Sequence, residues 1–214
     1  MCEWQSGEKT TFGAMLREQR WDDHRYYHHS RINQTLHLLS ACTFITAFIL
    51  LFTSPVVGVM AAWIIGMCSR QIGHFFFEPR GYDEVNQATD EHKEAVKVGY
   101  NIQRKVWLMS IWALSPLLLL ASPSLFGIFT PHTDVASFLH NMSILWIAIG
   151  IGAALFRTIQ LFFVRDVMTG LVWLTKILTD PLHDVSLYYK APFYLLKGEL
   201  VDPMADEARH AARA

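Results

Sequence analysis

The sequence predicts an all-α membrane protein, a helical bundle with about four transmembrane helices and with both termini in the cytoplasm. Of its 214 residues, 52% are hydrophobic and only 17% are charged, whereas soluble domains carry about 25% charged residues. The hydrophobic residues are concentrated in long runs that are separated by polar segments. We therefore interpret residues 1–214 as a single integral membrane domain.

The balance of charges argues against a nucleic-acid partner. The 18 Lys and Arg residues nearly neutralise the 19 Asp and Glu residues, and no long run of like charge occurs. A nucleic-acid-binding surface needs an excess of positive charge, which this chain lacks. Its hydrophobic composition instead makes the bilayer and a lipid the expected partners. The oligomeric state is left open.

The first apolar run extends over residues 36–69 and is interrupted near its middle by Ser54, Pro55 and Gly58. A helix needs about 20 apolar residues to cross a bilayer, and proline disfavours helix at the residue before it. The run therefore predicts a hairpin of two helices, over about residues 33–53 and 56–77. Two further apolar runs, 106–128 and 142–164, each have the length of one crossing.

The positions of the basic residues predict the orientation of these spans. All Lys and Arg residues lie before residue 32, between residues 70 and 105, or from residue 157 onward. The positive-inside rule places these segments in the cytoplasm. We thus expect a cytoplasmic N-terminal segment (1–32), membrane spans (33–165) with a cytoplasmic loop at about 78–105, and a cytoplasmic interfacial C-terminal region (166–214). The membrane would be the bacterial inner membrane or the endoplasmic reticulum, with the active site facing the cytoplasm.

The polar segments carry weaker structural signals. Residues 81–105 are predicted to form a helix that runs into the third span, and residues 165–178 form an apolar stretch that suits a helix along the interface. From Thr179 onward, the Asp180-Pro181 and Asp202-Pro203 pairs predict loops.

Two clusters of polar residues lie at the cytoplasmic ends of the first two spans. In the first, a helix that starts by His29 would place His29, Asn33 and His37 on one face, because residues four apart share a face. His28 precedes this series directly.

The second cluster repeats the same four-residue spacing at Arg70, His74 and Glu78. Glu78 is a candidate metal ligand, a partner of a ligand histidine, or an ion-pair partner of Arg70. Arg70 is either structural or a binder of a substrate carboxylate.

The predicted hairpin brings both clusters to the same membrane surface. Ionisable side chains at that depth are costly unless they are paired or coordinated, so His29, His37 and His74 together predict a metal site, with His28 as a further candidate. Nitrogen and oxygen ligands favour iron or zinc over magnesium or calcium. The alternative is that the histidines only form hydrogen bonds. If the tail folds back, His183 beside Asp184 adds a ligand; a surface loop is equally compatible with that segment.

These two clusters resemble the family of small multi-span membrane proteins that includes the yeast 2-hydroxy fatty acid dioxygenase of phytosphingosine breakdown. The resemblance covers residues 26–80. It implies ferrous iron and dioxygen, and a reaction that shortens 2-hydroxy fatty acids by one carbon on the cytoplasmic side of the membrane. The matching residues are Tyr26, Tyr27, His28, His29, Asn33, His37, Trp63, Gln71, Gly73, His74, Phe77 and Glu78.

The leading hypothesis is therefore an Fe(II)-dependent lipid oxygenase of the α-oxidation type, in which Asn33 and Glu78 support catalysis. Arg31 and Arg70 are close enough in sequence to the clusters to hold the substrate carboxylate. One alternative is a zinc-dependent membrane lipid hydrolase or lyase with Glu78 as the base. Another is a non-enzymatic membrane scaffold or transporter subunit.

Overall fold

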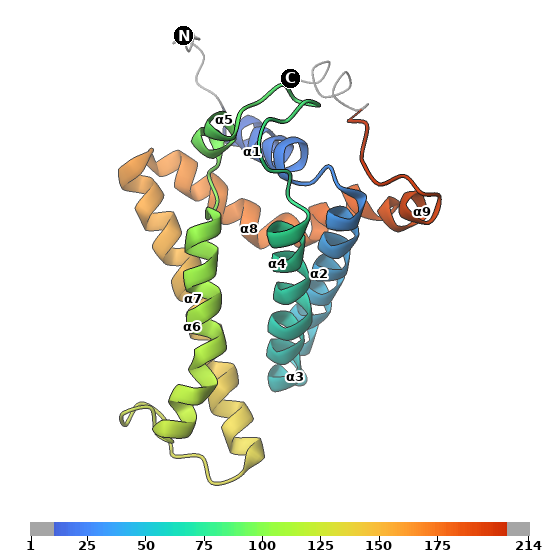
Figure 1. Cartoon of the computed structure of the whole chain (residues 1–214). Helices are drawn as coiled ribbons and strands as arrows, with labels where there is room; N and C mark the ends of the chain where they lie inside the picture. The colour runs from blue at the N-terminus through green and yellow to red at the C-terminus, as the bar shows by residue number, and fades with distance from the viewer. Residues whose placement is uncertain (1–10, 205–214) are drawn as a thin grey trace.

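The computed structural model describes residues 11–204, and every regular element within this range is a helix. Four of the helical segments are long and apolar enough to cross a membrane, which confirms the predicted all-α membrane bundle. Figure 1 shows these spans standing beside one another, with α1, α5, α8 and α9 gathered at one end, here called the polar end. The orientation of the bundle relative to the cytoplasm stays a prediction.

The first two spans form the expected hairpin. Helix α2 (Arg31–Leu50) is followed by a turn and by a continuous helical segment made of α3 (Pro55–Met60), a π-helical stretch (Ala61–Met67) and α4 (Cys68–Phe76). Pro55 is the first residue of this second span. Proline suits that position because the N–H that it lacks would have no partner within the helix.

The third and fourth spans are α6 (Ile102–Ala121) and α7 (Val135–Val164). Both begin earlier than the apolar runs suggest, because polar residues cap them. Asn101 accepts a hydrogen bond from the N–H of Arg104 at the start of α6, and Asp134 forms a capping box with Ser137 at the start of α7. The capped starts add about one turn or more at the N-terminus of each span.

An apolar cluster joins the two hairpins away from the polar end. Trp63 of the π-helical stretch stacks on Trp112 of α6, with ring centroids 5.4 Å apart. Trp146 of α7 packs beside both rings and donates a hydrogen bond from Nε1 to Ser115 Oγ. This indole core fixes the second span against α6 and α7.

Helix α8 (Val167–Tyr188) crosses the polar end of the bundle and packs against α1 (Phe12–Tyr27), α2 and α7 (Figure 1). The prediction of loop structure from Thr179 onward is wrong here, since α8 continues through Pro181. Asp180 pairs with Lys176 one turn earlier at 2.6 Å, and both side chains are buried. This ion pair and the packing of the turn compensate for the loss of the backbone hydrogen bond that Pro181 cannot donate. Helix α9 (Ala191–Leu196) follows.

The predicted continuous helix into the third span is also wrong. Helix α5 (Asp90–Val96) ends before Lys97, whose backbone is extended, and α6 starts only after Asn101. The intervening stretch is held instead by the side chain of Arg157 of α7, which donates hydrogen bonds to the carbonyl oxygens of Val98 and Gly99.

Candidate metal centre

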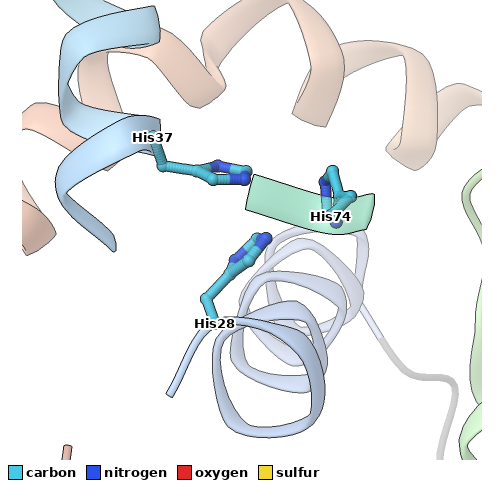
Figure 2. Close-up of side chains that lie close together, drawn as sticks. All are labelled: His28, His37 and His74. Atoms are coloured by element: carbon cyan, nitrogen blue, oxygen red, sulfur yellow. The ribbon is translucent and has the colours of Figure 1, made fainter. Parts of the chain in front are cut away.

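Three histidines from three different segments converge at the polar end of the first hairpin. His28 caps the C-terminus of α1, His37 lies in the second turn of α2, and His74 lies in the last turn of α4. Their exposed fractions are 3%, 0% and 8%. One ligand nitrogen from each lies within 4.8 Å of the other two, and Figure 2 shows the three rings facing one another. We call these residues the histidine trio.

A polar group lies near the Nδ1 atom of each member of the trio, and it is within hydrogen-bond distance for His74 and His28. His74 Nδ1 lies 2.7 Å from Glu78 Oε2, and His28 Nδ1 lies 3.2 Å from the hydroxyl of Tyr188. His37 Nδ1 lies 3.6 Å from Asp184 Oδ2. Partners on the outer nitrogen are typical of metal-bound histidines, because they fix the ring orientation and the tautomer.

The inner nitrogen atoms make the metal interpretation specific. Among the described residues, His28 Nε2 and His37 Nε2 are buried and have no hydrogen-bond partner, and His37 Nδ1 also lacks one because Asp184 lies too far away for a hydrogen bond. A buried polar atom without a partner is costly, and a bound cation would satisfy both Nε2 atoms. Three imidazole nitrogens suit iron or zinc and do not suit calcium or magnesium, which prefer oxygen. The trio therefore fits a transition-metal ion.

Burial also favours the neutral form of His28. It lowers the pKa of His28 well below the usual value, and the neighbouring His37 and His74 lower it further. The neutral imidazole is the form that coordinates a metal.

The structure places His29 outside the trio. Helix α2 starts at Arg31 with Ser30 as its N-cap, so the condition that the helix starts by His29 is not met and His29 does not share a face with His37. His29 Nε2 lies 3.6 Å from Asp83 Oδ2 instead. His28, at the end of α1, provides the third nitrogen.

Asn33 holds the junction between α1 and the two spans. Its amide donates a hydrogen bond to the carbonyl oxygen of Tyr27 at 2.7 Å, which fixes the chain just before His28. Its Oδ1 atom faces Gly73, where a Cβ atom would lie only 2.1 Å away. Glycine at this position therefore allows α2 and α4 to approach closely enough for His37 and His74 to meet.

The two arginines predicted to bind substrate are already paired with carboxylates of the chain. Arg31 Nη1 lies 2.6 Å from Asp202 Oδ2. Arg70 Nη1 lies 2.9 Å from Asp184 Oδ2, and its Nη2 lies 3.9 Å from Asp180 Oδ2. Through Asp184, Arg70 is linked to the partner of His37.

His183 lies on α8 and is not a member of the trio. It lines a small polar pocket that also reaches His28 and Tyr188. Of the two alternatives for this segment, the structure shows the return to the site, but Tyr188 and Asp184 are the residues that lie beside the trio. The other residues lining this pocket are Arg20, Asp23, Arg70, Lys176, Asp180, Asp184 and Leu187.

Two residues at the site were not singled out by the sequence, Lys97 and Lys105. Both ammonium groups face Glu78, at 2.9 Å from Oε1 and 3.9 Å from Oε2. Their position just before and within the first turn of the third span was the available signal, because it places them at the same membrane surface as His74.

Comparisons of the chain with protein-family models, curated proteins and solved structures find no match. What the trio can do is therefore inferred from its own residues and from the motifs of residues 26–80.

Proposed function

We propose that this protein is an Fe(II)-dependent membrane oxygenase that shortens 2-hydroxy fatty acids by one carbon, with its active site on the cytoplasmic side. The observation that supports it best is the histidine trio: three buried imidazoles at the polar end of a membrane bundle, two of them with a hydrogen-bond partner at Nδ1. The resemblance of residues 26–80 to 2-hydroxy fatty acid dioxygenases favours iron and this substrate class.

His28, His37 and His74 would hold the metal. Ferrous iron bound by three imidazoles would supply redox chemistry with dioxygen and open positions for a hydroxyl and a carboxylate. The balanced reaction consumes one dioxygen per 2-hydroxy acid and yields the shorter acid, carbon dioxide and water. The described residues around the trio hold it in place: Glu78 orients His74, and Tyr188 orients His28.

The bundle suits an amphiphilic substrate. The trio lies at the polar end of the spans, so a head group would bind there while the acyl chain lies along apolar helix surfaces. Each buried methylene would contribute about 0.8 kcal/mol. The absence of basic residues from the turn and loop at the opposite end of the spans supports a cytoplasmic position for the trio.

The zinc hydrolase alternative receives less support from the same geometry. Its base would be Glu78, but both carboxylate oxygens are engaged, one by His74 and the other by Lys97. A carboxylate held in this way is suited to orienting His74 more than to taking a proton from water.

The test is anaerobic purification, metal analysis and incubation of the reduced protein with 2-hydroxypalmitate and oxygen. We expect one iron per chain, oxygen uptake and a fifteen-carbon acid. His37→Ala should abolish product formation, whereas His140→Ala, an exposed histidine on α7 at the opposite end of the spans, should not. Conversion of palmitate instead, stoichiometric zinc, or no oxygen uptake would overturn the proposal.

A further inference from the structure

The carboxylate of Glu78 is surrounded by three nitrogen-bearing side chains. His74 Nδ1 and Lys105 Nζ both approach Oε2, at 2.7 and 3.9 Å, and Lys97 Nζ lies 2.9 Å from Oε1. The side chains of Glu78, Lys97 and Lys105 are only 7%, 6% and 11% exposed. A lysine thus lies beside the trio, sharing one carboxylate oxygen with a trio histidine.

The two lysines differ in how well they are paired. Lys97 has Glu78 at hydrogen-bond distance, Glu94 at 3.4 Å and the ring of Tyr27 at 4.0 Å. Lys105 has no hydrogen-bond partner among the described residues, and its one ion-pair contact there is 3.9 Å long. An ammonium group has three donors, and leaving them unpaired in a buried position is costly.

The position of Lys105 fits the head group of a membrane amphiphile. It lies in the first turn of α6, and the next residues of that span, Val106 and Trp107, are exposed apolar side chains. A carboxylate paired with Lys105 would therefore lie at the membrane surface beside the trio, with its alkyl chain directed along an apolar span.

We infer that Lys105 is the residue that binds the carboxylate of a long-chain fatty acid at this site. The inference rests on the proposed function for the class of ligand. It gives Lys105 the role that the sequence suggested for Arg31 and Arg70, whose guanidinium groups are already paired with Asp202 and with Asp184 and Asp180.

Binding of radiolabelled palmitate to the full-length protein in neutral-lipid nanodiscs tests this inference without turnover. Lys105→Met should raise the dissociation constant of palmitate at least tenfold, whereas Lys105→Arg should retain most of the binding. Arg104→Met removes a charge from the adjacent exposed position and should leave binding unchanged. Methyl palmitate, which lacks the charge, should bind the wild-type protein and Lys105→Met equally.

Equal palmitate binding by the wild-type protein and Lys105→Met would overturn the inference, as would an equal loss of palmitate and methyl palmitate. Binding of phosphatidic acid without any binding of palmitate would also overturn it, because the ligand would then be a phospholipid phosphate. Palmitate is not the substrate, so a Lys105-dependent affinity would stand even if no iron or oxygen uptake were found. Failure of the oxygenase assay is in this way distinguished from failure of the carboxylate site.

Discussion

A single helix cap decides whether His28 or His29 joins the trio. Ser30 accepts a hydrogen bond from the N–H of Asn33 and starts α2, so His28 and His29 lie between two helices and point to different partners. His28 faces His37 and His74, with ring centroids 4.0 and 5.2 Å away, whereas His29 faces Asp83. Two adjacent histidines therefore have different surroundings, and only His28 belongs to the trio.

This geometry predicts different metal contents for substitutions at adjacent positions. His28→Ala, His37→Ala and His74→Ala should each lower the metal content of the purified protein at least tenfold, because each variant keeps only two of the three imidazoles that would hold the metal. His29→Ala should retain the metal. Metal analysis of purified protein, with thermal unfolding as a check on the fold, measures the difference. Metal loss in His29→Ala with a normal unfolding temperature would contradict this assignment.

Sequence patterns could suggest which residues gather at the site but not their roles. His37, His74 and Glu78 follow from four-residue spacing at the ends of two consecutive apolar runs, and the structure brings them together. The choice between His28 and His29 depends on the cap at Ser30. The role inferred for Lys105 depends on its contact with Glu78, which lies 27 residues earlier in the sequence. Such contacts leave no periodic signal along the chain.

At the element scale, the contact between α2 and α4 controls how closely the trio members approach. A methyl group at Gly73 would meet Asn33 Oδ1 at 2.1 Å and push the helices apart. Gly73→Ala should therefore destabilise the protein by about 2 kcal/mol and reduce metal retention. Gly152→Ala in α7, where the added Cβ meets nothing within 4 Å, should be neutral or slightly stabilising. Thermal unfolding and metal content compare the two variants, and equal effects would contradict the close-contact explanation.

The four apolar spans are the elements that the sequence predicts best. Spans of apolar residues are long and continuous, so their existence and approximate ends could be inferred from hydropathy alone. Helix α8 beyond Thr179 could not, because its continuation through Pro181 is accompanied by ion pairs of the buried Lys176 with Asp180 and with the partly exposed Asp23 of α1. The break between α5 and α6 likewise depends on Arg157 of a later helix.

At the scale of the whole molecule, the distribution of basic residues predicts the membrane orientation. A fluorescent-protein fusion after Ala214 should be fluorescent in the cytoplasm, and an alkaline phosphatase fusion after Ser124, in the loop between α6 and α7, should be active outside it. The reason is that residues 122–134 contain no Lys or Arg, whereas the segments at the polar end are rich in them. Activity of an alkaline phosphatase fused after Ala214 instead would contradict this orientation and place the trio on the other side of the membrane.

The crossing of α8 over the spans also has a consequence for the order in which the protein is made. The three imidazoles belong to the first 74 residues, but the groups beside two of them, Asp184 and Tyr188, are synthesised more than 100 residues later. Chains emerge from the ribosome N-terminus first, so the nitrogen atoms are in the membrane before their partners exist. The trio therefore gains these two neighbouring groups only in the last stage of biogenesis, and a metal held by the trio would reach its final surroundings only then.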